Sequence, residues 1–174
     1  GAMDRLGLGY EDLKGINPRL IYASVKGFGS FGPYSDYKCF EQVAQATSGA
    51  LSATGWADRP PSPLGANVGD SGTGMHTVIG ILAALVQRNI TGEGQMVEVA
   101  MQEAVLNLTR VRFTGTLTDG EPEPRQEFSG SAYTGGLGGL VPCAPGGLND
   151  YVYMMIPADN PGMFTAGMRA MGRE

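Results

Sequence analysis

Histidine and cysteine are scarce in this chain of 174 residues, which contains one histidine, His76, and two cysteines, Cys39 and Cys143. The cysteines lie far apart and fit no metal-ligand spacing, so the sequence predicts free thiols in a reducing compartment and no metal site. Basic residues are not in excess either: the 12 Lys and Arg residues are scattered, and the formal net charge is −5. We therefore expect no nucleic-acid partner.

Long apolar runs are also absent. No run reaches the roughly 18 residues that a membrane-spanning helix needs, and the chain does not open with the pattern of a signal peptide. These absences predict a soluble, cytoplasmic protein with no membrane partner. Gly1-Ala2-Met3 is typical of a cleaved expression tag, and the chain stops abruptly at Glu174. We therefore expect a fragment of a longer protein.

Hydrophobic residues nevertheless make up 42% of the chain, which is enough to fill a core. Strand patterns over residues 19–25 and 95–100 alternate with helix patterns over 37–54, from about Ser71 onward, and over 101–113. This alternation predicts an α/β fold, in which a Rossmann-like parallel sheet is covered by helices and ligands bind beyond the carboxyl ends of the strands.

The composition changes after about residue 114. Residues 115–130 are rich in Thr, Pro and Glu, which predicts a connection between part of a large domain over 4–114 and the beginning of a smaller α+β domain over 131–174. We expect a strand over 151–156 and a helix over about 161–171 in the smaller domain. Its methionines are predicted to fill a core or an interface, namely Met154, Met155, Met163, Met168 and Met171.

One carboxylate, that of Asp70, stands among residues with little or no side chain in the segment Val68-Gly69-Asp70-Ser71-Gly72-Thr73-Gly74-Met75-His76. Asp70 precedes a helix and occupies the position of an N-cap, whose side-chain oxygen accepts an N–H of the first turn. The same place suits a nucleophile, because the positive end of the helix dipole favours an ionised carboxylate. The spacing leaves both interpretations open. The helix is predicted to have an apolar face formed by Val78, Ile79, Leu82, Leu85 and Val86.

Four stretches in this order carry a resemblance to a known family. They are Asn17-Pro18-Arg19-Leu20-Ile21-Tyr22-Ala23-Ser24-Val25-Lys26-Gly27-Phe28-Gly29, Lys38-Cys39-Phe40-Glu41-Gln42-Val43-Ala44-Gln45-Ala46, Gly69-Asp70-Ser71-Gly72-Thr73-Gly74-Met75-His76, and Thr91-Gly92-Glu93-Gly94-Gln95. Taken together, they resemble the class III CoA-transferase family, and its formyl-CoA transferases in particular.

The resemblance implies that Asp70 is a covalent nucleophile. Its carboxylate would attack the thioester of a donor acyl-CoA to give a mixed anhydride, and the CoA thiolate would convert this anhydride into an aspartyl-CoA thioester. An acceptor carboxylic acid would then reverse the sequence, so the partners are an acyl-CoA and a small carboxylic acid, and no further cofactor is expected. The family also implies an interlocked homodimer at full length, and weak activity at best for the isolated chain.

The resemblance assigns roles to other residues as well. Glu41 matches a glutamate that lies close to the nucleophile and orders the site, and Lys38 matches a lysine near the CoA phosphates. Phe40 stands where formyl-CoA transferases carry a tyrosine, which indicates a changed acid specificity. Substrate binding is also implied for residues beside the nucleophile and in a glycine loop interrupted by Leu137, namely Gly69, Gly135, Gly136, Gly138 and Gly139. Plain structural roles stay open for these residues: an exposed carboxylate, a solvated lysine and a flexible turn.

Two other functions stay open. An acyl-CoA racemase on the same scaffold would need a His/Asp pair, and His76 is a poor candidate because it lies in the same helix as Asp70. We expect His76 to be a hydrogen-bonded core histidine instead. The chain could also be an oligomerisation or binding module without enzymatic activity, in which Asp70 serves only as a helix cap.

Overall fold

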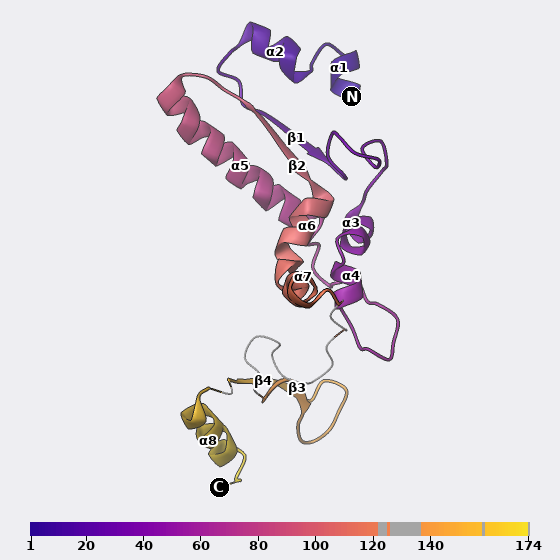
Figure 1. Ribbon diagram of the computed structural model, residues 1–174, viewed down its shortest axis with the longest axis vertical. Helices are drawn as coiled ribbons and strands as arrows, with labels where there is room; N and C mark the ends of the chain where they lie inside the picture. Colours follow the sequence, from indigo (N-terminus) through magenta and orange to yellow (C-terminus); the bar gives the residue numbers. More distant parts are fainter. Residues whose placement is uncertain (122–124, 126–136, 158, 174) are drawn as a thin grey trace. The chain divides into compact units, whose positions relative to one another are not determined.

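The computed structural model describes residues 1–121, 125, 137–157 and 159–173 (Figure 1). The chain divides into two compact units. The first unit comprises Gly1–Thr54 and Pro61–Glu123, and the second comprises Gly55–Pro60 and Pro124–Glu174. Among the described helices, none combines the length and the apolar composition that crossing a bilayer requires.

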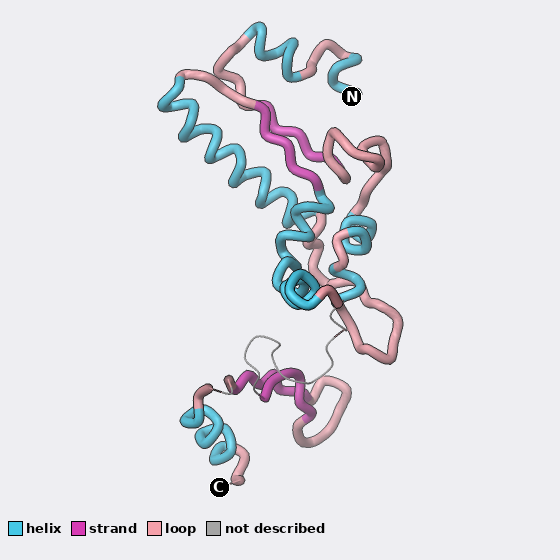
Figure 2. Tube along the Cα trace, viewed as in Figure 1, coloured by secondary structure: helices cyan, strands magenta, loops and turns pink. Residues whose placement is uncertain are grey.

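The first unit is built around two parallel strands. β1 (Tyr22–Lys26) pairs with β2 (Met96–Ala100) from Tyr22 opposite Met96 to Lys26 opposite Ala100. The crossover between them carries α3 (Glu41–Thr47), α4 (Ala50–Ala53) and the long helix α5 (Asp70–Thr91). Figure 2 shows this alternation of strand, helices and strand. The predicted α/β fold with a parallel sheet is thereby confirmed.

β1 begins three residues later than predicted because a turn uses the residues before it. The Asn17 side chain accepts the N–H of Arg19 at 3.0 Å, and the Asn17 carbonyl accepts the N–H of Leu20 at 3.0 Å. This arrangement holds Arg19 and Leu20 in the turn, so the strand starts beyond them.

Further helices flank the strands. α1 (Ala2–Arg5) and α2 (Tyr10–Ile16) precede β1, and α6 (Met101–Thr109) follows β2 directly. The helix predicted over 101–113 has the expected position, but its last turn is the 3₁₀-helix η1 (Arg110–Phe113). The chain then continues as α7 (Thr114–Asp119), so the beginning of the predicted connection is helical. The assignment of the two units to a large and a small domain stays a prediction.

The single helix predicted over 37–54 is wrong. It is divided into α3 and α4 at Gly49, whose φ of 83° lies in the left-handed region that favours glycine. Space also matters here, because a Cβ at Gly49 would lie 2.7 Å from Cζ of Phe113. Gly49 thus provides both the break in the helix and room for the ring.

α5 packs through its small residues and not through the predicted apolar face. Gly72, His76, Gly80 and Ala84 recur every fourth residue, which places them on one side of the helix. A Cβ at Gly72 would lie 2.8 Å from the Leu108 side chain, and one at Gly80 would lie 2.7 Å from Val97. The larger apolar residues that we expected to pack are mostly exposed, namely Val78, Ile79, Leu82 and Val86. α5 therefore approaches α6 closely at Gly72 and β2 closely at Gly80, where the helix has no side chain.

A small core lies beneath the segments that precede α3 and α5. It consists of Ala44, Ala50, Met101 and Val105. Three partly buried residues pack against this core, namely Cys39, Leu64 and Val68. The core therefore anchors the chain immediately before Glu41 and immediately before Gly69.

The described residues of the second unit form an antiparallel pair of strands and one helix. β3 (Leu137–Pro142) pairs with β4 (Tyr151–Ile156), and α8 (Pro161–Ala170) follows. β4 has the predicted bounds, and α8 differs from its prediction by one residue. Asn160 caps α8 by accepting the N–H of Met163 at 3.0 Å. Five methionines were predicted to fill a core or an interface. Three of them are exposed and therefore do not fill a core, namely Met155, Met163 and Met171.

Replacing Gly49 with alanine is expected to lower the free energy of unfolding by about 1–3 kcal/mol, because a left-handed backbone and an overlap with Phe113 both oppose a Cβ there. Gly15→Ala is the matched control, since a Cβ at Gly15 in α2 would meet nothing within 4 Å. Chemical denaturation of the two variants provides the comparison. Equal stabilities would contradict the role given to Gly49.

Candidate active site

Glu41 joins the start of α3 to the start of α5. Its side chain is buried, with 6% of its surface exposed. Oε1 accepts the backbone N–H of Gly69 at 2.8 Å, and Oε2 accepts the backbone N–H of Asp70 at 2.7 Å. Such N–H groups have no partner within their own helix. Glu41 therefore caps α5 from a different helix.

Gln45 holds Glu41 in this position. It lies one turn further along α3 and is 1% exposed. Its amide nitrogen donates to Oε1 of Glu41 at 2.7 Å, while its amide oxygen accepts the N–H of Leu64 at 2.9 Å. Both ends of the amide are used, so three segments of the chain meet at one buried network. We call Glu41, Gln45 and the backbone N–H groups that they bind the clamp.

The clamp favours the ionised form of Glu41. Burial raises the pKa of this carboxyl group, but the hydrogen bonds from Gln45 and from the N–H groups of Asp70 and Gly69 outweigh burial, so the pKa lies below its ordinary value. A carboxylate that accepts three hydrogen bonds at the positive end of a helix is well suited to this place.

Asp70 is not the N-cap, so that interpretation is wrong. Gly69 occupies the cap position and has no side chain with which to cap the helix, so the capping hydrogen bonds come from Glu41. Asp70 is the first helical residue and is exposed. Within the described residues its carboxylate accepts no hydrogen bond, whereas its own N–H is held by Glu41. The backbone of Asp70 is thus fixed while its carboxylate is available to a ligand.

The other N–H groups of the first turn are engaged as well. The N–H of Ser71 donates to the Asn67 carbonyl at 2.9 Å, and that of Gly72 donates to the Val68 carbonyl at 3.1 Å. The beginning of α5 therefore has no free backbone donors over residues 69–72. An oxyanion near Asp70 would have to be stabilised by other groups.

Gly69 gives Glu41 the space it needs. Gly69 is buried, and a Cβ there would lie 3.1 Å from Oε2 of Glu41. Its carbonyl accepts the hydroxyl of Thr73, a side chain that is itself 1% exposed. A larger residue would push the carboxylate away from the two N–H groups that it binds.

The site lies beyond the carboxyl end of β1, as predicted for a parallel sheet. Gly27 follows the last residue of β1, and a Cβ on Gly27 would overlap the Cβ of Cys39. Cys39 stands two residues before Glu41. Figure 1 shows that α3, α5 and α6 meet near this end of the sheet.

The negative charges of the site act on the Cys39 thiol. Burial raises the pKa of its thiol, and the negative charges of Asp70 and Glu41 raise it further. The thiol is therefore protonated at neutral pH, which makes it a weak nucleophile.

The remaining predicted site residues do not take part in the clamp. Lys38 and Phe40 are exposed in the segment before α3, with 70% of Phe40 accessible. Gly138 and Gly139 lie in β3 and not in a loop, which corrects their predicted conformation. Gly135 and Gly136 lie outside the described residues. The structure thus brings together Glu41, Gly69 and Asp70.

Two members of this neighbourhood, Gln45 and Cys39, were missed as site residues by sequence reasoning. Gln45 follows Glu41 by four residues, the spacing at which helical side chains meet, so a signal was present. Nothing in the sequence indicated the approach of Cys39 to Asp70.

His76 is hydrogen-bonded, as predicted, and through both ring nitrogens, but it is half-buried and not a core residue. Nδ1 lies 2.7 Å from the carbonyl of Gly72, which can only accept, so Nδ1 carries the proton. Nε2 is then the acceptor for the side-chain amide of Asn107 at 2.8 Å. The ring is occupied by structural partners.

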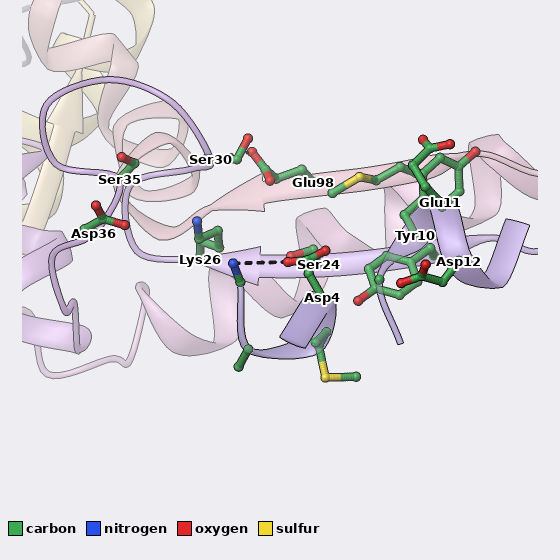
Figure 3. A pocket seen from close by; sticks show the side chains of 16 residues that line it. Asp4, Tyr10, Glu11, Asp12, Ser24, Lys26, Ser30, Ser35, Asp36 and Glu98 are labelled. Carbon is green, nitrogen blue, oxygen red and sulfur yellow. Dashed lines mark hydrogen bonds and ion pairs between the residues drawn. The ribbon is translucent and has the colours of Figure 1, made fainter. Parts of the chain in front are cut away.

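A separate cavity of about 620 Å³ lies over the other face of the sheet (Figure 3). Ser24 and Glu98 line it from β1 and β2, whereas α5 packs on the face that carries Val97. Its other polar lining residues include Asp4, Glu11, Asp12 and Lys26. Neither Asp70 nor Glu41 borders this cavity, so it is distinct from the clamp.

Replacing Glu41 with glutamine is expected to cost about 1–3 kcal/mol of stability at neutral pH, because the amide NH₂ would face a backbone N–H. The pKa of Glu41 is lowered in the folded state, so its contribution is complete above the unfolded-state pKa, about 4.3, and disappears as the pH falls through the folded-state value. The stability difference between wild type and E41Q should therefore shrink in acid. Denaturation curves at several pH values measure it, with the exposed Glu103→Gln in α6 as control; a difference independent of pH would contradict the clamp.

Replacing Asp70 with asparagine is expected to lower the pKa of the Cys39 thiol, because a negative charge that disfavours the thiolate is removed. Alkylation of Cys39 by iodoacetamide should then become faster at a given mildly alkaline pH. Peptide mass spectrometry across a pH series gives the rate. Cys143, in the second unit, serves as the internal reference. Superimposable pH profiles for Cys39 in the two proteins would show that Asp70 does not act on it.

Comparisons with known proteins show the family of this chain. The whole chain, residues 1–174, matches CoA-transferase family III. It is 52% identical over 170 residues to the formyl-CoA:oxalate CoA-transferase of Streptomyces avermitilis, with 90% of this chain and 41% of that protein covered. The corresponding protein of Streptomyces coelicolor is also 52% identical, with 90% and 40% covered. The chain thus spans about two fifths of the length of these relatives.

Solved structures show the same relationship. A CAIB/BAIF family protein from Brucella suis superposes with a TM-score of 0.79 at 32% identity, covering 99% of this chain and 43% of that one. A hypothetical protein from Mycobacterium tuberculosis gives a TM-score of 0.78 at 24% identity, covering 100% and 43%, and shares the fold. The resemblance found in the sequence is confirmed, and the chain belongs to CoA-transferase family III.

Proposed function

We propose that the protein moves CoA from an acyl-CoA thioester to a free carboxylic acid, with Asp70 as the covalent nucleophile. The observation that carries this proposal is the contrast at residue 70. Its backbone N–H is fixed by Glu41 at 2.7 Å, while its carboxylate is exposed and accepts no hydrogen bond within the described residues. A nucleophile needs this combination of a fixed position and free oxygens.

The proposed reaction has two halves. One oxygen of Asp70 attacks the thioester carbonyl of the donor, the C–S bond breaks, and CoA leaves as a thiolate while a mixed anhydride forms. The thiolate then attacks the carbonyl carbon of Asp70, and the donor acid leaves with the bridging oxygen as an aspartyl-CoA thioester forms. An acceptor carboxylate attacks this thioester, and the same steps in reverse yield the new acyl-CoA and restore Asp70.

Both halves pass through oxyanions, which need donors other than the first turn of α5, because those N–H groups are engaged. The resemblance supports Lys38 as a partner for the CoA phosphates, where an exposed cation has the right charge. Phe40 would then face the acid, without the hydroxyl that formyl-CoA transferases have there.

The relatives guide the choice of substrates. Formyl-CoA and oxalate are the first pair to assay, because the relatives at 52% identity are formyl-CoA:oxalate CoA-transferases. The chain covers 41% of such a relative, so activity is proposed for the full-length protein and is expected to be weak in the isolated chain. The exposed apolar side chains of α5 support assembly into a homodimer.

The two alternative functions are less well supported. A racemase would need a histidine free to exchange a proton with the substrate, whereas both ring nitrogens of His76 have partners. A binding module with Asp70 as a helix cap does not fit either, because Glu41 does the capping. The transferase proposal accounts for both observations.

Replacing Asp70 with alanine or asparagine in the full-length protein is expected to reduce CoA transfer on the order of a thousandfold or more, because no covalent intermediate can form. Incubation with acyl-CoA and hydroxylamine should leave a hydroxamate on Asp70 of the wild type, detected by peptide mass spectrometry. Asp36→Asn, an exposed carboxylate in the loop before α3, is the control and should retain both activity and trapping. Normal turnover by the Asp70 variants would rule out the proposed mechanism.

A further inference from the structure

We infer that Gln45 is a positioning residue for the transfer reaction: it holds Glu41, and through Glu41 it holds the peptide at Gly69 and Asp70. The inference deepens the proposed function and depends on it for its kinetic part. Gln45 does not reach the reacting atoms itself. Its side-chain amide bonds Glu41 on one side and the N–H of Leu64 on the other.

The Gln45 side chain is costly to bury. Gln45 is 1% exposed, and a buried amide is costly unless its hydrogen bonds are made. Here the amide nitrogen bonds a buried carboxylate at 2.7 Å and the amide oxygen bonds a backbone N–H at 2.9 Å. An apolar residue would fill the same space but would leave Oε1 of Glu41 with one fewer donor.

Gln45 also orients the carboxylate of Glu41. Its two oxygens bind two successive N–H groups, which requires the carboxylate plane to lie in one orientation. Gln45 donates to Oε1, the oxygen that also accepts from Gly69. Loss of Gln45 would let the carboxylate rotate, and the N–H of Asp70 would lose its fixed acceptor. The carboxylate of Asp70 would then have no single position from which to attack a thioester.

Gln45 is connected as well to the segment before α5. Leu64 packs against the core, and its N–H is held by Gln45. The same side chain therefore sets both the approach of this segment and the cap at its end. No other described side chain bonds both Glu41 and the segment that leads to Asp70.

Kinetic analysis of Gln45→Ala in the full-length protein tests the inference. We expect kcat to fall about tenfold or more, with KM for acyl-CoA changed little, because a hydrogen bond to a charged group is lost away from the substrate. Gln42→Ala, an exposed glutamine on the same helix, is the matched control and should resemble wild type. A kcat within twofold of wild type, per folded protein, would overturn the inference.

Gln45→Glu provides a readout that a plain core role would not change. At neutral pH the new carboxylate would face that of Glu41, with Asp70 and the Cys39 thiol as the other titratable groups nearby. As the pH falls, one proton shared by the pair would restore a donor to Glu41. The ratio of Q45E to wild-type kcat should therefore rise from pH 8 to pH 5.5, whereas Gln42→Glu should show a flat ratio. A flat ratio for Q45E would also overturn the inference, and this test applies where Q45A does not fold.

Amide hydrogen exchange separates this inference from the proposed function. Peptides that contain Gly69 and Asp70 should exchange faster in Q45A than in wild type, while peptides from β2 should be unchanged. This result does not depend on any activity. Full activity of Asp70→Asn would end the proposed mechanism but leave the exchange test valid. An inactive D70N together with a Q45A that is normal in kcat and exchange would overturn the role of Gln45 alone.

Discussion

The structure of the site depends on one carboxylate that binds two adjacent peptide N–H groups of another helix. Glu41 does at α5 what a capping side chain normally does from the residue next to the helix. Because the cap comes from α3, the residue at the helix start is relieved of that task. The same contact explains why Gly69 must be small, why Gln45 is buried, and why the pKa of Glu41 is lowered. Asp70 thereby combines a rigid backbone with free side-chain oxygens.

The clamp would be of little use if α5 itself could shift. Its packed side carries Gly72, Gly80 and Ala84, whose side chains are small or absent, so β2 and α6 lie close against it. His76 adds a directional contact in the same row, because its ring joins the helix to Asn107 of α6. The far end is fixed too, since Arg19 donates to the Gly92 carbonyl at 3.0 Å. The helix that begins at Asp70 is thus held along its length.

Much of the fold could be predicted because its signals are local. β2 and β4 follow from short apolar runs, and β1 was misplaced only where Asn17 forms a turn. The break at Gly49 was missed because the helical pattern continues across it. β3 was missed because a glycine-rich strand has no side-chain alternation to read. The apolar periodicity of α5 predicted the wrong packed side, since most of its bulky apolar residues are exposed and Gly72 and Gly80 are packed.

The site was predicted in part for the same reason. Asp70 stood out because its neighbours are small. Glu41 was indicated by the resemblance of the chain to a known family. The clamp itself could not be predicted, because Glu41 and Gly69 are 28 residues apart and their contact is a matter of tertiary structure. Reasoning from neighbouring residues therefore assigned the capping role to the nearest carboxylate, that of Asp70. The carboxylate of Glu41, distant in sequence, provides the cap.

The clamp also isolates Asp70 from a stretch of chain that leaves the first unit and returns. The chain departs at Thr54 and re-enters at Pro61, and the N–H of Ser62 donates to the Thr54 carbonyl at 3.2 Å, closing the base of this excursion. Gln45 then holds Leu64 two residues later. Within the second unit, Arg125 donates to the Trp56 carbonyl at 3.0 Å and to the Arg59 carbonyl at 2.8 Å. A change of length within residues 55–60 would therefore disturb these contacts, while the closed base keeps the change from moving residue 70.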